Sequence, residues 1–261
     1  IISAIRNCDI LISGGGSLFQ DRTSISSFWY YSAIILLAFI LKKPVFAYAH
    51  GIGPIRSRFN KKLLRFVMNR VAKLSVRDQR SKTELQNIGV SREITTTIDP
   101  AFLIEPVSRE ESVKLLEKEM GQSIEGRRRI GFSIRFWEEE GHVDVAGIFA
   151  KVCDRVKKEL DADVLLIPLH NKEDVTLAEN IASLMTEKAT IIKEKYTPAQ
   201  IIGMYGLLDV SVCIRFHGLV FSIMNGTPVV AISYDPKIDS LMDSLGMNKV
   251  IRYGQINEDI I

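Results

Sequence analysis

Cysteine and histidine are scarce in this chain of 261 residues, and their spacing argues against two kinds of site. The three cysteines, Cys8, Cys153 and Cys213, lie far apart, each within or beside an apolar segment, and form no Cys-x-x-Cys pair. The four histidines also lack the spacing of metal ligands. We therefore expect reduced, buried thiols, a cytoplasmic protein and no metal site.

An excess of one charge and a long hydrophobic run are also missing. The formal net charge is only +3, with 34 Lys and Arg scattered among 31 Asp and Glu, so no basic stripe predicts nucleic-acid binding. The apolar run at residues 28–41 is shorter than the roughly 20 residues that a bilayer span needs. We interpret it as a buried or half-buried helix. The alternative is peripheral association with a membrane surface, which its Trp and Tyr residues would tolerate.

The two ends of the chain lack features of a complete α/β domain. The chain opens at Ile1 without an initiating Met, a basic leader or a small-residue cleavage site, and it stops at Ile261 soon after a turn at Gly254. An α/β domain would still need a helix there to cover its last strand. We expect a fragment that is truncated at the N-terminus and at the C-terminus.

Short apolar segments alternate with segments of helical periodicity along the whole chain, which predicts parallel βαβ units. We therefore expect an α/β fold of two Rossmann-like domains, with parallel sheets facing a cleft. The expected strands are residues 9–13, 45–49, 74–76, 94–98, 130–134, 164–168, 190–192, 210–214, 228–233 and 249–252.

The sequence turns polar between residues 103 and 129, and we place the domain boundary there. The predicted domains are residues 1–104, which form the incomplete N-terminal half, and residues 105–261. Three consecutive arginines at residues 127–129 stand beside this linker. We interpret them as a solvated cluster.

In the first domain, two predicted strands run into glycine-rich turns, at residues 14–16 and 51–53. Glycines let a ligand or another backbone come close, although a tight turn required by packing would use the same residues. Polar residues after the first turn favour a substrate contact, but neither a Walker loop nor a complete G-x-G-x-x-G is present. His50 either contacts a ligand or bonds a neighbouring carbonyl. The candidate substrate-binding residues of this half are Gly15, Gly16, Gln20, His50 and Gly51.

In the second domain, the strand that ends at residue 214 delivers Arg215 and His217 to a turn before a helix, and the next strand ends just before Lys237. Arg135 follows another predicted strand. Ligands bind outside the carboxyl ends of parallel strands, and nitrogen donors beside a helix N-terminus suit an anion. The alternatives are a structural histidine, a solvated lysine, and an ion pair of Arg135 with Glu138 or Glu139.

Six stretches of sequence, in this order, resemble the polysaccharide pyruvyl transferase family. They are ILISGGGSLFQD (10–21), VFAYAHGIGPI (45–55), SVRDQRS (75–81), IDPAF (98–102), FSIRFW (132–137) and CIRFHGLVFSIMNGTPVVAISYDPK (213–237). The resemblance implies a GT-B-like fold and a transferase without a cofactor. It also implies phosphoenolpyruvate as donor, bound by the second domain. The acceptor, on the first domain, would be a lipid-linked or polymeric saccharide of a cell-wall or exopolysaccharide precursor, and the product a pyruvate ketal.

The resemblance also implies roles for particular residues. Phosphoenolpyruvate carries a carboxylate and a phosphate, so its site needs several fixed cations, which Arg135, Arg215 and Lys237 can supply. His217 suits proton transfer because the reference pKa of histidine is about 6.5, and we assign it general acid or stabiliser of the intermediate. Lys237 would assist the departing phosphate. The family's acidic residue, the expected general base, would precede Ile1.

Two other functions stay open at this point. One is a GT-B glycosyltransferase or a sugar-nucleotide epimerase, for which Asp235 and Asp239 are the candidates to hold a ribose. The other is a non-catalytic member of the family that retains the fold. Transfer from a sugar nucleotide instead of phosphoenolpyruvate would identify the first, and an upstream sequence without an acidic residue would favour the second.

Overall fold

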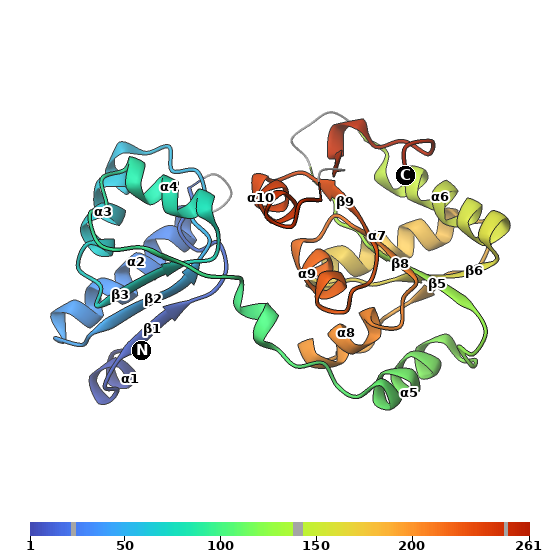
Figure 1. The fold of residues 1–261 in the computed structure, drawn as a ribbon, viewed down its shortest axis with the longest axis horizontal. Coiled ribbons are helices and arrows are strands. Elements are labelled where there is room, and N and C mark those ends of the chain that lie inside the picture. The colour runs from blue at the N-terminus through green and yellow to red at the C-terminus, as the bar shows by residue number, and fades with distance from the viewer. Residues whose placement is uncertain (22–24, 138–142, 248–249) are drawn as a thin grey trace. The chain divides into compact units, whose positions relative to one another are not determined.

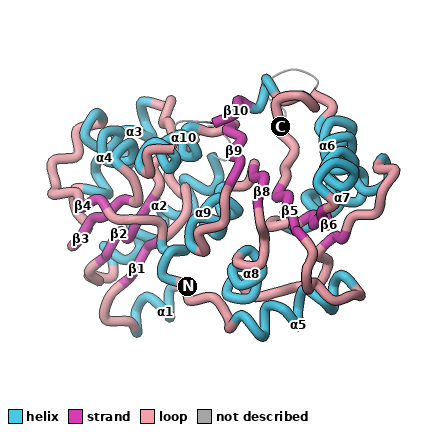
Figure 2. Tube along the Cα trace, turned by 45° about the vertical axis from the view of Figure 1, so that its right-hand side comes forward, coloured by secondary structure: helices cyan, strands magenta, loops and turns pink. Residues whose placement is uncertain are grey.

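The computed structural model describes residues 1–21, 25–137, 143–247 and 250–261. Two compact units divide the chain: unit 1 is Ile1–Pro100 and unit 2 is Ala101–Ile261 (Figure 1). The predicted boundary after residue 104 lies just beyond the short helix η1 (Pro100–Leu103). Each unit contains a parallel sheet whose strands alternate with helices, as Figure 2 shows, so the predicted α/β class is confirmed.

Unit 1 is built on a four-stranded sheet in which the order in space follows the order in sequence. Its strands are β1 (Leu11–Gly14), β2 (Val45–His50), β3 (Lys73–Val76) and β4 (Thr95–Thr96). Its helices are α1 (Ile2–Asn7), α2 (Ile25–Ile40), α3 (Arg58–Met68) and α4 (Gln79–Asn87). Helix α1 was not predicted, because in its six residues only Ile5 is buried and no periodic pattern develops.

Unit 2 is built on a six-stranded sheet with the order β10-β9-β8-β5-β6-β7. Its strands are β5 (Arg128–Ser133), β6 (Ala162–Leu166), β7 (Thr190–Ile191), β8 (Val210–Cys213), β9 (Val229–Ser233) and β10 (Val250–Arg252). Its helices are α5 (Arg109–Met120), α6 (Val145–Leu160), α7 (Asn171–Leu184), α8 (Pro198–Tyr205), α9 (Phe216–Met224), α10 (Pro236–Ser244) and η2 (Tyr253–Gln255). The strand order reverses between β5 and β8, which is the Rossmann arrangement.

Both faces of the unit 2 sheet are covered by helices. Successive side chains of a strand point to opposite faces. Val164 and Leu166 of β6 accordingly pack with α6 and α7, whereas Leu165 and Ile167 pack with α8 and α9. Every residue of β6 is buried, including Asp163 near its amino end, and its other four residues are apolar.

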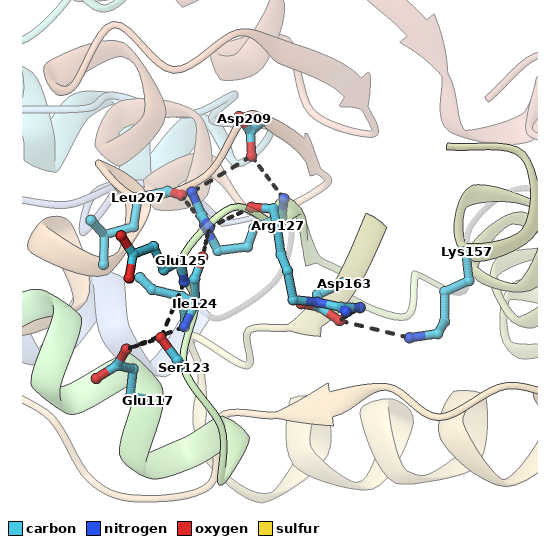
Figure 3. A network of polar contacts seen from close by, with 10 residues as sticks. Glu117, Ser123, Ile124, Glu125, Arg127, Lys157, Asp163, Leu207 and Asp209 are labelled. Carbon is cyan, nitrogen blue, oxygen red and sulfur yellow. Dashed lines mark hydrogen bonds and ion pairs between the residues drawn. The ribbon is translucent and has the colours of Figure 1, made fainter. Parts of the chain in front are cut away.

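Two arginines tie together the amino ends of β5, β6 and β8, and Figure 3 shows Arg127 with its partner Asp163. Arg127 donates to both carboxylate oxygens of Asp163, at 2.6 and 2.9 Å. Arg129 donates from its side chain to the Leu207 carbonyl at 2.6 Å and from its backbone to Asp209 at 2.7 Å. The Arg129 side chain is only 14% exposed, so the interpretation of the cluster as solvated is wrong for this residue.

The carboxyl ends of the unit 1 strands are tied together by Arg77, which directly follows β3. Its side chain and that of Asp99 are 5% and 7% exposed, and Arg77 Nη1 lies 2.7 Å from Asp99 Oδ2. Arg77 Nη2 donates to Ser17 Oγ at 2.8 Å, and the Arg77 backbone N–H donates to the His50 carbonyl at 3.2 Å. One buried arginine therefore joins the chain segments that follow β1, β2 and β4.

Replacement of Arg77 by leucine should destabilise unit 1 by about 3 to 5 kcal/mol, because Asp99 would keep a buried charge that has lost this partner. Urea unfolding in the Trp137→Phe chain measures this, since Trp29 in unit 1 is then the sole tryptophan. Arg80→Leu is the control, because Arg80 is exposed on α4. Equal urea midpoints for the two variants would contradict a structural role for Arg77.

Candidate functional site

The candidate site lies where the strand order of unit 2 reverses, at the carboxyl ends of β5 and β8. The Ser133 carbonyl, at the end of β5, accepts the backbone N–H groups of Ile214 and Arg215 at 2.9 and 3.2 Å. The chain segments that leave the two strands therefore start from one point. Open α/β sheets bind ligands in the crevice outside this reversal.

Helix α9 begins directly at this point. A Cβ on Gly218, in the first turn, would lie 3.0 Å from Cys213 Sγ, Ser133 Cβ and Tyr205 Oη. Only glycine lets the helix approach the ends of β5 and β8 this closely. The electropositive N-terminus of α9 is thereby held at the strand edge, where it favours a negatively charged ligand.

Two of the predicted cations, Arg135 and Lys237, gather around Tyr234. Arg135 Nη1 donates to Tyr234 Oη at 2.7 Å. The Arg135 guanidinium carbon lies 4.7 Å from the centroid of the Tyr234 ring and 5.0 Å from that of Trp137. Lys237 Nζ lies 5.4 Å from the Tyr234 ring centroid. We call Arg135, Trp137, Tyr234 and Lys237 the Tyr234 cluster.

The Tyr234 cluster is positioned from four parts of unit 2. The rings of Trp137 and Tyr234 are 4.7 Å apart, and the Trp137 backbone N–H donates to Tyr253 Oη at 2.9 Å. Asp235 caps α10 by accepting the Lys237 backbone N–H at 3.0 Å. Burial raises the pKa of Tyr253 above its ordinary value, so this hydroxyl stays protonated. The cluster thus depends on the ends of β5 and β9, the start of α10, and η2.

Arg215 has a different partner, Asp174 of α7. Arg215 Nε donates to Asp174 Oδ2 at 2.8 Å, and Nη2 contacts Oδ1. The side chains are 14% and 2% exposed, and the carboxylate also accepts the His170 backbone N–H at 2.9 Å. This bidentate pair joins the first turn of α7 to the start of α9. Substrate binding by Arg215 stays a prediction, and the geometry adds this positioning role.

His217 lines a pocket of about 760 Å³ at the carboxyl ends of β6 and β7. Its ring is stacked with Phe221, with the two centroids 6.0 Å apart. The pocket is lined by Ala101, Ile104, Pro168, Leu169, His170, Lys172, Val175, Ile192, Lys193, Glu194, Lys195, Tyr196, Pro198, Ile201, His217 and Phe221. Arg135 and Lys237 are not among the described residues that line this pocket.

Sequence reasoning missed Trp137, Tyr234 and Asp174 as parts of the site. Trp137 and Tyr234 stand beside the predicted strand ends, and aromatic faces hold cations, so their position was a usable signal. Asp174 gives no such signal, because it reaches Arg215 from 41 positions away in the sequence. Glu138 and Glu139, the alternative partners of Arg135, lie outside the described residues.

In unit 1, the two predicted glycine turns bond each other. The Gly51 N–H donates to the Gly16 carbonyl at 3.0 Å, and Gly15 and Gly16 adopt left-handed φ angles of 75° and 68°. A Cβ on Gly51 would lie 2.7 Å from the Arg77 guanidinium nitrogens, and one on Gly53 would overlap Gln20. Backbone conformation therefore explains Gly15 and Gly16, and packing explains Gly51 and Gly53. Contact of Gly15, Gly16 and Gly51 with substrate stays a prediction.

His50 is fully buried beneath these turns. Its Nε2 lies 3.3 Å from Ser13 Oγ, and its ring meets the edge of Phe19 with the centroids 4.9 Å apart. The His50 ring thus contacts the Ser13 hydroxyl, and a backbone hydrogen bond with Ser13 also acts on it. Burial, with a smaller contribution from the charge of Arg77, lowers the pKa of His50 to about 4. His50 is therefore neutral at pH 7.

This pKa predicts acid-sensitive stability in unit 1. Because the folded chain binds the His50 proton less readily than the unfolded chain, stability is complete above the ordinary pKa of 6.5 and is lost as pH falls toward 4. The loss should be on the order of 3 kcal/mol. Urea midpoints of the Trp137→Phe chain across this pH range measure it, with His50→Gln as the comparison. An equally steep pH dependence in His50→Gln would contradict the assignment.

Solved structures of two 2-epimerases and of a glycosyltransferase have a similar fold. The UDP-GlcNAc 2-epimerase from Neisseria meningitidis, bound to UDP-GlcNAc, gives a TM-score of 0.63 at 15% identity, over all of this chain and 70% of its own. A putative UDP-N-acetylglucosamine 2-epimerase from Listeria monocytogenes gives 0.63 at 15% identity, over 99% and 65%. A glycosyltransferase from Rickettsia africae gives 0.57 at 16%, over 99% and 66%. They confirm the GT-B-like fold class.

The sequence comparisons identify the family. The amylovoran biosynthesis protein AmsJ of Erwinia amylovora is 24% identical over 259 residues, which are 93% of this chain and 61% of that protein. The chain thus spans less than two thirds of this relative. The family model for polysaccharide pyruvyl transferases matches residues 1–236. The chain belongs to the polysaccharide pyruvyl transferase family.

Proposed function

We propose that this protein transfers the pyruvyl unit of phosphoenolpyruvate to a sugar of an exopolysaccharide or cell-wall precursor and forms a pyruvate ketal. The observation that carries the proposal is the gathering of Arg135 and Lys237 around Tyr234, beside the reversal of the unit 2 sheet. Arg135 is held on aromatic faces, and Lys237 lies over the Tyr234 ring and 3.6 Å from Asp235 Oδ2. Two cations placed in this way suit a small donor with two anionic groups. Family membership supports a role in polysaccharide biosynthesis.

Arg135 and Lys237 suit different anionic groups of the donor. The planar guanidinium of Arg135 matches the two oxygens of a carboxylate, and the compact ammonium of Lys237 suits the phosphate that departs. Tyr234 orients both through its hydroxyl and its ring. The alternative of a glycosyltransferase or a sugar-nucleotide epimerase needed Asp235 or Asp239 to hold a ribose. Asp235 caps α10, and Asp239 accepts two bonds from Arg252 at 2.8 and 2.9 Å, so the arrangement favours pyruvyl transfer.

The reaction has two additions at C2 of the donor. A sugar hydroxyl adds to C2, its proton passes to a base, and the methylene carbon gains a proton. A second hydroxyl then replaces phosphate, which leaves with the electron pair of its bond to C2, and the proton of this hydroxyl passes to the departing phosphate. We assign protonation or stabilisation of the intermediate to His217, which stands in the first turn of α9 beside the pocket, and assistance of phosphate departure to Lys237.

The saccharide acceptor is assigned to the turns of unit 1. Gly15, Gly16, Gln20 and Gly51 lie at the carboxyl ends of β1 and β2, which is where loops of parallel sheets contact ligands. His50 is buried below them and acts on the acceptor only through the turns that it supports. The acceptor would be lipid-linked or polymeric.

His217→Ala should lower kcat by about 100-fold or more, because a general acid contributes on that order, while the Kd for phosphoenolpyruvate stays nearly constant. Transfer of carbon label from phosphoenolpyruvate to a saccharide acceptor measures turnover, and calorimetry measures donor binding. His170→Ala, on the same pocket, is the matched control. Equal losses of turnover and binding would show that His217 is structural. Transfer from labelled sugar nucleotides alone would overturn the proposed function.

Tyr234→Phe tests the Tyr234 cluster. The variant keeps the ring but removes the hydroxyl that holds Arg135. A hydrogen bond to a charged group contributes about 1.5 to 3 kcal/mol, so the Kd for phosphoenolpyruvate should rise by about tenfold or more. Tyr30→Phe, at an exposed tyrosine of unit 1, should leave this Kd unchanged. An unchanged Kd in Tyr234→Phe would remove Tyr234 from donor recognition.

A further inference from the structure

Helix α2 presents apolar side chains to solvent as well as to the core. Its 16 residues include no charged side chain. Phe28 and Ile35 are fully buried in unit 1, whereas Trp29 is 43% exposed, Tyr30 53% and Ile25 57%. A surface helix of a globular protein normally carries polar and charged residues on the side away from the core. This exposed side therefore differs from an ordinary solvated face.

Helix α3 adds aromatic rings that alternate with cations. Phe59 is 61% exposed and Phe66 is 44% exposed. Arg58 and Lys62 are exposed beside Phe59, and Arg70 lies over Phe66, with the guanidinium carbon 3.6 Å from the ring centroid. The helix contains no acidic residue. This side of α3 is thus both apolar and positively charged.

The exposed sides of α2 and α3 form one surface. The rings of Trp29 and Phe59 are stacked, with their centroids 5.4 Å apart and their planes at 23°. We call Ile25, Trp29, Tyr30, Phe59, Lys62 and Phe66 the α2–α3 surface. The two helices lie beside each other in unit 1 (Figure 1), so these side chains come from neighbouring elements.

We propose that the α2–α3 surface binds the face of a bilayer that contains anionic lipids. Tryptophan and tyrosine prefer the boundary between headgroups and acyl chains, and phenylalanine inserts its ring there. Lys62, Arg58 and Arg70 complement anionic headgroups, and no acidic residue of α3 opposes them. No helix in the described part of the chain is long and apolar enough to cross a membrane, so α2 lies on the bilayer instead of spanning it.

The surface also lies close to the turns that the proposed function assigns to the acceptor. Helix α2 is the next helix after β1, and α3 is the next after β2, so both start near the carboxyl edge of the unit 1 sheet. Ile25 and Phe59 stand in the first turns of these helices. A lipid-linked saccharide would then reach the turns from the membrane side. Only this last link rests on the proposed function.

Vesicle binding tests the proposal without donor or acceptor, so its result is independent of the proposed function. In the Trp137→Phe chain the only tryptophan is Trp29. Vesicles of phosphatidylcholine with phosphatidylglycerol should shift Trp29 emission to the blue and carry the chain in flotation, and added salt should weaken both effects. Vesicles of phosphatidylcholine alone should do neither. The absence of a shift and of flotation with the anionic vesicles would overturn the proposal.

Matched variants locate the binding surface. Arg58→Glu with Lys62→Glu, and separately Phe59→Ser with Phe66→Ser, should each weaken binding by about tenfold or more. The controls lie on unit 2: Lys151→Glu with Lys188→Glu, and Leu184→Ser, which alters a leucine that is 56% exposed. Equal binding by variants and controls would overturn the assignment of the surface. Self-association lost only in Phe59→Ser with Phe66→Ser, without vesicle binding, would show a protein interface instead.

Discussion

The meeting of β5 and β8 is the constraint on which the functional half of this protein depends. One carbonyl, that of Ser133, accepts the N–H groups of both Ile214 and Arg215, so the chain leaving β8 is bound to the end of β5 before α9 begins. Gly218 then allows α9 to touch both strand ends. His217 and Arg215 stand on either side of Phe216 at this junction, and their directions follow from the backbone there.

Arg215 and Arg135, which follow β8 and β5, have different kinds of partner. Arg215 faces a carboxylate that is 2% exposed, and the paired charges largely cancel. Among the described residues, Arg135 is instead held by the hydroxyl of Tyr234 and by aromatic faces, which attract a cation without neutralising it. A dianionic ligand gains more from the second kind of cation. The Tyr234 cluster is therefore the stronger candidate for donor recognition, and Arg215 fixes the frame around it.

The sequence predicted the fold well because the evidence for parallel βαβ units is local: apolar strands, helical periods and turns follow one another along the chain. It predicted Arg135 and Lys237 because both stand next to strand ends. The partners that decide what each cation does come from elsewhere in the chain: Asp174 reaches Arg215 across 41 positions, and Tyr234 reaches Arg135 across 99. Local pattern carries no record of such tertiary pairs, so the sequence could not show that Arg215 pairs with Asp174.

Helix α2 is a second element whose environment the sequence alone could not determine. A helix with no charged residue has no polar stripe, so its periodicity cannot tell which side meets the core, and both burial and a membrane surface fit the run at residues 28–41. The structure shows which side of α2 meets the core: Phe28 and Ile35 are buried in unit 1, whereas Trp29 is partly exposed and stacks on Phe59. The cations around Phe59 then distinguish a bilayer from a purely apolar partner, because only α3 carries charge and all of it is positive. The α2–α3 surface thus combines the apolar side of α2 with the positive charge of α3, and these two helices become neighbours only in the fold.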